Sequence, residues 1–260
     1  MIKTLRLLKK VLRNPRAFAR YFTFCIKQYG YFDLIEYAAS GASDKGVSGH
    51  DYIRVYDHFL RGRRHEPLEV CEIGLAMKDS ADLEQKAHTD WRHKRYSDAP
   101  SLAMWRKYLP EAHLIGFDIR TFLPSRDRNA ELIQGDQSSR EDLQRIVANG
   151  RTLDVVIDDG LHASRHQQVT FSALFPSLKP KGLFFIEDLG YQPEGFEEKN
   201  VPLTLDVLKR FQATGEWTSP LSTPEERRTI ERDVAAIYIY DSRKGTTPDF
   251  IDCLAVIIKK

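Results

Sequence analysis

Short apolar runs alternate with amphipathic stretches through the middle of the chain. Runs with the length and the β-branched or aromatic content of buried strands occupy residues 68–74, 113–119, 130–136, 153–160 and 182–188. Stretches with helical periodicity lie between most of these runs, at 101–109, 138–149 and 163–178. Strands that alternate with helices in this order predict an α/β fold with a parallel sheet covered on both faces.

The C-terminal pattern is different. Apolar runs at 235–242 and 253–260 are joined by a turn that contains Gly245 and Pro248, which predicts a hairpin. The sheet should then end with an antiparallel strand. We therefore expect a seven-stranded, mostly parallel, Rossmann-like sheet with an antiparallel C-terminal hairpin.

Two segments fall outside this sheet. Residues 1–40 have helical periodicity, interrupted at Pro15, and predict a basic helical extension ahead of one domain at 41–260. Residues 76–99 are strongly polar and separate the first strand from the next helix. We interpret them as an inserted flap near the ligand site, with a plain surface loop as the alternative.

Composition and charge narrow the class of protein. The 260 residues are 42% hydrophobic and 29% charged, with a formal net charge of +2, which is typical of a globular protein. The three cysteines lack the spacing of disulfide pairs or zinc ligands. No apolar run reaches the roughly 20 residues that a membrane span needs. No secretory signal is recognisable. These features predict a cytoplasmic protein.

Basic residues cluster at the N-terminus. Residues 1–32 contain lysines and arginines interleaved with leucines and phenylalanines, and no acid. Such a segment can lie on an anionic membrane, although packing on the domain or on a second subunit of a homo-oligomer explains it slightly better. No nucleic-acid-binding module is recognisable, so a nucleic-acid partner is not expected.

Acidic residues gather at the carboxyl ends of the five predicted parallel strands. They are Glu72, Asp118, Asp136, Asp158, Asp159, Glu187 and Asp188. In an open α/β sheet these strand ends form the edge at which ligands bind. We therefore expect the binding site of this protein at that edge.

Some of these residues suit a nucleoside. Asp118 can accept hydrogen bonds from both ribose hydroxyls, and Asp136 or Gln137 can hold the adenine amine. Gly74, at the end of the first strand, allows a ligand to approach the backbone closely. Capping of the following helices is the alternative for each acid taken singly. The two acids in this order favour the nucleoside.

The remaining acids suit a divalent cation. Converging carboxylates are unfavourable unless a cation neutralises them, and oxygen ligands without cysteine indicate Mg²⁺, Ca²⁺ or Mn²⁺. Neighbouring strand residues point to opposite faces, so we assign Asp159 to the metal and Asp158 to the cofactor side. Glu187 and Asp188 complete the predicted metal site.

His162 follows the fourth strand at the start of the predicted helix 163–178. A helix N-terminus disfavours the imidazolium and keeps the ring neutral, as a general base requires. A histidine that merely caps its own helix is the alternative, and the acids beside it favour the base.

Taken together, these motifs resemble a known family. They are SDKG (43–46), EIG (72–74), GFDI (116–119), GDQ (135–137), IDDGLH (157–162) and LFPSLKPKGLFFIED (174–188). This set resembles the metal-dependent sugar O-methyltransferases of macrocin and mycinamicin type, with relatives among rhamnosyl O-methyltransferases and cephalosporin hydroxylase-like proteins. The resemblance implies a class I methyltransferase fold, S-adenosylmethionine, Mg²⁺, and a sugar hydroxyl that the metal coordinates and a histidine deprotonates.

The resemblance also implies residue roles. The second acid of IDDG, Asp159, and the two acids of IED would bind the metal, and His162 would be the base. The residues that match the loop over the methionine part of the cofactor are Ser43, Lys45, His50 and Tyr52, and Glu72 and Gly74 of EIG lie on the cofactor side.

The chain departs from the family pattern at two places. The polar insertion follows Gly74 where the family has a glycine-rich stretch, and Leu161 replaces a serine. Besides methylation of a sugar hydroxyl on a glycosylated natural product or a glycan, two functions therefore stay open. One is methylation of a small phenol or catechol, and the other is a non-catalytic role on the same fold.

Overall fold

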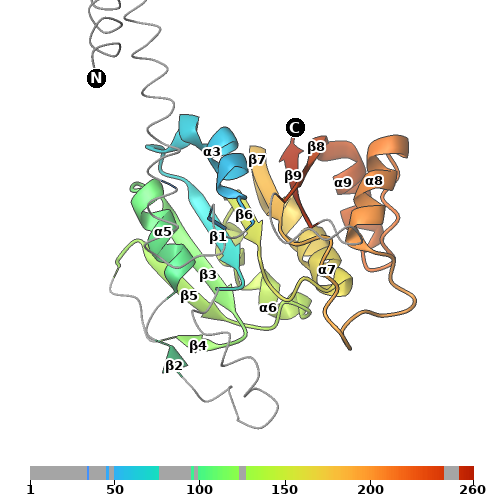
Figure 1. Cartoon of the computed structure of the whole chain (residues 1–260), viewed down its shortest axis with the longest axis horizontal. Coiled ribbons are helices and arrows are strands. Elements are labelled where there is room, and N and C mark those ends of the chain that lie inside the picture. The colour runs from blue at the N-terminus through green and yellow to red at the C-terminus, as the bar shows by residue number, and fades with distance from the viewer. Residues whose placement is uncertain are drawn as a thin grey trace, which may run out of the picture.

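A seven-stranded sheet forms the centre of the molecule (Figure 1). The computed structural model describes residues 34, 45–46, 50–75, 95–96, 99–122, 127–242 and 252–260. The strands are β1 (Glu69–Ile73), β3 (His113–Asp118), β5 (Ala130–Gln134), β6 (Leu153–Asp158), β7 (Leu178–Ile186), β8 (Val234–Asp241) and β9 (Cys253–Lys259). Their order is β5-β3-β1-β6-β7-β9-β8. This confirms the predicted seven-stranded, mostly parallel sheet.

The antiparallel strand lies inside the sheet. β9 pairs antiparallel with both β7 and β8, so β8, not the last strand, is at the edge. The sequences explain this order. The first five residues of β9 are buried, as in a strand covered on both faces, whereas β8 is half exposed along its length.

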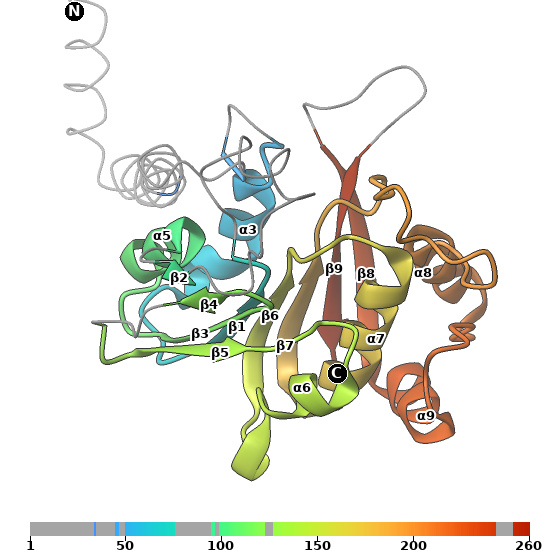
Figure 2. The same ribbon diagram turned by 90° about the horizontal axis from the view of Figure 1, so that it is seen from below.

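Helices cover both faces of the sheet (Figure 2). One face carries α3 (Ile53–Leu60) and α5 (Pro100–Tyr108). The other carries α6 (Arg140–Gln144), α7 (Ser164–Leu174), α8 (Thr204–Thr214) and α9 (Pro224–Asp233). Short 3₁₀ turns span Arg61–Arg63, Ala148–Gly150 and Phe175–Ser177. Two hydrophobic cores result, one on each face.

The middle of the central strand β6, residues 155–157, is apolar at every position. Val156 packs into the core under α7, and its neighbours Val155 and Ile157 pack into the core under α3 and α5. All six residues of β6 are buried. A parallel strand between two helical layers needs apolar side chains on both sides, so the run lacks a polar alternation.

The helices differ from the sequence prediction in two ways. The helix expected at 138–149 ends at Gln144 and gives way to a 3₁₀ turn in which Asn149 has a left-handed φ of 59°. Helices α8 and α9 had no sequence prediction. A capping box between Thr223 and Glu226, with Pro224 at the first turn, marks the start of α9 and is a signal that was missed.

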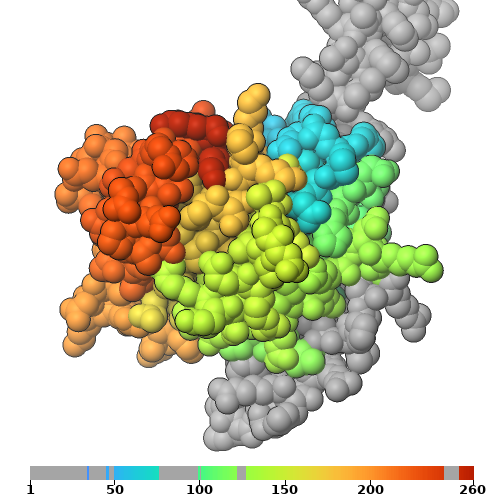
Figure 3. Space-filling view, turned by 180° about the vertical axis from the view of Figure 1, so that it is seen from behind, coloured from blue at the N-terminus to red at the C-terminus, as the bar shows by residue number. Residues whose placement is uncertain are grey.

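The predicted N-terminal extension lies outside the described residues, apart from the buried Leu34. Most of the predicted flap at 76–99 also lies outside them. Its described part forms β2 (Arg95–Tyr96), which pairs in parallel with β4 (Thr121–Phe122). Among the described helices, none is long and apolar enough to cross a membrane. In the view from behind, the C-terminal helices α8 and α9 lie on the opposite side of the molecule from α3 (Figure 3).

Candidate active site

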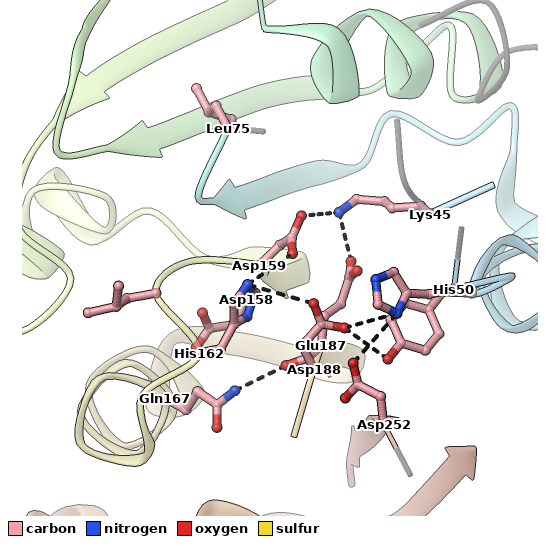
Figure 4. Close-up of polar contacts among 12 residues, drawn as sticks. Lys45, His50, Leu75, Asp158, Asp159, His162, Gln167, Glu187, Asp188 and Asp252 are labelled. Carbon is pink, nitrogen blue, oxygen red and sulfur yellow. Dashed lines mark hydrogen bonds and ion pairs between the residues drawn. The ribbon is translucent and has the colours of Figure 1, made fainter. Parts of the chain in front are cut away.

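Successive strands are added on one side of β1 as far as β5 and on its other side from β6 onward. The candidate site lies at this change in strand order, at the carboxyl ends of β1, β6 and β7 (Figure 4). Backbone hydrogen bonds continue past the strands, from Asp159 N to Ile73 O at 2.8 Å and from Glu187 N to Asp158 O at 2.9 Å. Gly74 has a left-handed φ of 80°, and a Cβ there would overlap the Asp159 backbone. Glycine is therefore required where these strand ends meet.

Lys45 lies at the centre of the carboxylates. Its ammonium pairs with Asp159, lies 2.9 Å from Glu187 Oε1 and lies 3.6 Å from Glu72 Oε1. The Tyr56 hydroxyl donates a further hydrogen bond to Glu187. All of these side chains are buried, so one internal cation offsets part of the charge of three carboxylates.

A second group of side chains contains the predicted base. His162 Nε2 lies 3.7 Å from Asp188 Oδ2 and 4.0 Å from Asp159 Oδ1. One ligand atom from each of these three residues lies within 4.8 Å of the other two, so the group could hold a metal ion. Glu187, the third predicted metal ligand, contacts Lys45 and Tyr56 instead.

His162 does not sit inside the helix. It precedes the N-cap residue Ala163 and has a left-handed φ of 65°. This backbone turn places the imidazole beside the ends of β6 and β7. The sequence correctly predicted that His162 lies next to the start of α7. The turn brings its imidazole close to Asp159 and Asp188.

A third group involves a residue that sequence reasoning missed. Asp252 Oδ2 lies 3.5 Å from His50 Nδ1, which in turn lies 3.6 Å from Asp188 Oδ1. Tyr52 donates a 2.9 Å hydrogen bond to Asp188 Oδ1. A signal was available, because Asp252 immediately precedes β9. The start of an antiparallel strand lies at the same sheet edge as the ends of its parallel neighbours.

Burial governs the protonation of these groups. Burial raises the pKa of the Asp188 carboxyl to about 8, and the negative charges of Glu187 and Asp252 add to the rise. Burial also raises the pKa of Glu72, although the Lys45 ammonium opposes it. The pKa of the Tyr52 hydroxyl is raised in the same way, so it stays a hydrogen-bond donor. Negative charge is thus unfavourable here, and a divalent cation would relieve it.

The predicted nucleoside residues lie at the neighbouring strand ends. Asp118 accepts 2.8 Å hydrogen bonds from the backbone N–H groups of Leu75 and Arg120. Asp136 accepts hydrogen bonds from the backbone N–H and the hydroxyl of Ser138, at 2.8 and 2.7 Å. Asp136 therefore stabilises a local turn, and Asp118 also joins the turn after β3 to the end of β1. Both arrangements are compatible with a further role toward a ligand.

Gln137 and Asp158 form a buried pair. Gln137 Nε2 donates to Asp158 Oδ1 at 2.5 Å, and Gln137 Oε1 accepts from Leu161 N at 3.1 Å. Burial raises the pKa of the Asp158 carboxyl to about 7. Asp158 thus contacts Gln137, whereas the next residue, Asp159, pairs with Lys45. Ser43 lies outside the described residues.

Comparison with solved structures defines the class of fold. The chain matches the MycE methyltransferase from the mycinamycin biosynthetic pathway, solved in complex with Mg and SAH, with a TM-score of 0.64 and 26% sequence identity. The match covers 87% of this chain and 54% of that chain. The fold is therefore that of a class I methyltransferase, with the strand order and strand-end site described above.

Curated relatives narrow the assignment. One relative is a tetracenomycin 3'-O-methyltransferase of Streptomyces olivaceus, whose name gives a 2-methoxy-rhamnosyl tetracenomycin as its substrate. It is 33% identical to this chain over 200 residues, which are 72% of this chain and 47% of that protein. The mycinamicin VI 2''-O-methyltransferase of Micromonospora griseorubida is 29% identical over 216 residues, or 80% of this chain and 50% of that protein. The chain spans about half the length of the curated relatives it matches. No family model matches it.

These likenesses support membership of the macrocin and mycinamicin type of sugar O-methyltransferases. The resemblance that the sequence motifs predicted is thereby confirmed.

Proposed function

We propose that this protein is an S-adenosylmethionine-dependent and Mg²⁺-dependent O-methyltransferase that acts on a sugar hydroxyl. The observation that carries this proposal is the convergence of Asp159, His162 and Asp188 at the ends of β6 and β7. The relatives support it, because MycE has been solved with Mg and SAH and also with mycinamycin VI. The acceptor would be a glycosylated natural product or a glycan.

The cofactor would lie along the ends of β1, β3 and β5. Asp118 and Asp136, with Gln137, would hold the nucleoside, and Asp158 would support Gln137 through their hydrogen bond. The fit rests on the chemistry of these side chains, because carboxylate and amide oxygens at neighbouring strand ends can accept hydrogen bonds from ribose hydroxyls and an adenine amine. S-adenosylmethionine would supply the methyl group. The residues proposed around its methionine part are Ser43, Lys45, His50, Tyr52 and Glu72.

The metal would lie between Asp159 and Asp188, with Glu187 as a third proposed ligand. The fit rests on the chemistry of the donors, because burial raises the pKa of the Asp188 carboxyl and such clustered carboxylates favour neutralisation by a hard cation. When bound, Mg²⁺ would supply the positive charge that makes a sugar hydroxyl more acidic. Coordination by Asp159 and Glu187 together requires Lys45 to weaken its contact with one or both.

His162 would accept the proton of the acceptor hydroxyl at Nε2. That nitrogen lies 4.0 Å from Asp159 Oδ1, and the negative charge of this carboxylate would stabilise the imidazolium that proton uptake creates. The neutral tyrosines Tyr52 and Tyr56 donate to Asp188 and Glu187 and hold these carboxylates in place. The methyl group would pass to the acceptor oxygen as its bond to the cofactor sulfur breaks, which leaves S-adenosylhomocysteine.

Calorimetric titration of S-adenosylmethionine tests the proposal, with Mg²⁺ and with EDTA. We expect micromolar binding of the cofactor, and a separate Mg²⁺ titration that is lost in Asp159→Ala. The protein with S-adenosylmethionine and Mg²⁺ is then incubated with a rhamnoside or with a catechol, and methylated products are detected by mass spectrometry. Methylation of the rhamnoside supports the proposal, methylation of the catechol alone changes the acceptor class, and absence of cofactor binding overturns the proposal.

A further inference from the structure

One exposed aromatic side chain lies beside the proposed base. In the part of the chain that the structure describes, the exposed large hydrophobic residues are Ile119, Tyr191, Phe196 and Tyr238. The rings of Tyr191 and His162 are 6.0 Å apart between centroids, with their planes at 77°. Tyr238 lies elsewhere, on the edge strand β8, where its ring contacts Phe59.

The backbone holds Tyr191 in place. Its N–H donates to Asp188 O at 3.1 Å, and the preceding Gly190 N–H donates to Asp252 Oδ1 at 3.2 Å. The buried Leu189 donates to Cys253 O at 3.0 Å. Three consecutive residues after the β7 acids are thus tied to the site, so the backbone at Tyr191 is fixed relative to Asp188 and Asp252.

The Tyr191 ring is free to contact a ligand. The residue is 49% exposed, whereas the neighbouring His162 side chain is 18% exposed. The Tyr191 ring therefore presents an exposed aromatic surface next to the partly exposed imidazole of His162. The site then has two unlike walls, with Asp159, Asp188 and His162 on the polar side and Tyr191 on the apolar side.

A pyranose ring has the matching chemistry, because its hydroxyls project from its rim and its C–H groups form an apolar face. Aromatic rings with a polar tip suit ligands of this kind, which need an apolar surface next to a few oriented polar groups. We propose that the Tyr191 ring forms part of the acceptor-binding site. It packs against the C–H face of the sugar, and the hydroxyl to be methylated then faces His162. This inference rests on the proposed function and adds a residue that recognises the sugar.

Methyl α-L-rhamnopyranoside is the probe for the test, with full-length protein, Mg²⁺ and S-adenosylmethionine. Tyr191→Ala should raise the KM for the rhamnoside about tenfold, a size typical of losing one aromatic packing partner. Its kcat should change less, and the calorimetric Kd of S-adenosylmethionine should not change. Tyr191→Phe keeps the ring and should stay within about twofold of the wild type. Tyr238→Ala removes an aromatic ring of similar exposure and should have no effect.

The outcomes separate this inference from the proposed function. A wild-type protein that methylates the rhamnoside, with an unchanged KM in Tyr191→Ala, overturns the subsite and leaves the proposed function standing. A loss in Tyr191→Phe as large as that in Tyr191→Ala shows recognition by the hydroxyl and overturns stacking on the ring. A fall in kcat alone assigns Tyr191 to the orientation of His162 instead. A wild-type protein that neither binds nor methylates the rhamnoside overturns the proposed function and the subsite together.

Discussion

The Lys45 ammonium lies 2.9 Å from the Glu187 carboxylate and also pairs with Asp159, so an internal cation joins two of the predicted metal ligands. The lysine is fully buried, and its third carboxylate neighbour is Glu72 at 3.6 Å. Lys45 thus supplies positive charge at the place where a divalent cation would supply more. The two cations would compete for the same oxygen atoms.

We predict that Lys45→Met binds a divalent cation about tenfold more tightly than the wild type, because the loss of the competing ammonium leaves the carboxylates to the metal. Manganese titration followed by electron paramagnetic resonance measures this affinity without any turnover. Lys179→Met is the matched control, since Lys179 pairs with Asp154 at 2.6 Å away from the site. Weaker binding in Lys45→Met would show that Lys45 supports the metal site.

We predict that His162→Gln lowers the rate of methyl transfer by about 10²–10⁴-fold, the usual contribution of a general base. Glutamine retains a polar side chain of similar size but cannot take up the proton, so the Kd values of cofactor and metal should stay within about threefold by calorimetry. His65→Gln, at an exposed position, should be fully active. A His162→Gln enzyme with normal kcat would require another base.

Stability should depend on pH through Asp158. Burial raises the pKa of this carboxyl from 3.8 to about 7, so the folded protein binds the proton more tightly than the unfolded chain does. The free energy of unfolding should therefore fall as pH rises between about 4 and about 7, by up to about 1.4 kcal/mol per pH unit for each proton concerned. Urea unfolding in EDTA measures this slope. Asp158→Asn should have a shallower slope, and equal slopes for the two proteins would contradict the prediction.

Gly74→Ala should destabilise the protein by about 2 kcal/mol or more. The residue has a φ of 80°, and a methyl group there would overlap the backbone of Asp159 and Gly160. Gly62→Ala is the control, because a Cβ at Gly62 meets no atom within 4 Å and should change stability by less than about 0.5 kcal/mol. Urea unfolding compares both variants with the wild type. Equal stabilities would mean that the strand ends separate at little cost.

Local patterns were sufficient to predict most of the sheet. The run at 153–160 predicts β6 because a strand that is buried on both faces must be apolar on both. The same reasoning did not place β9 between β7 and β8, since the order of two hairpin strands depends on which of them is covered on both faces. Helix α6 was predicted too long, because the sequence around Asn149 forms a 3₁₀ turn instead of continuing the helix.

The sequence by itself determined that acids would meet at one edge of the sheet, because parallel strands end at a common edge. It also determined the place of His162 beside them. Only the tertiary structure decided which partner each carboxylate contacts. Lys45 reaches Asp159 across 114 residues of sequence, and Asp252 joins Asp188 because an antiparallel strand begins where the parallel strands end. Such pairings depend on the packing of distant segments, which no local pattern of residues encodes.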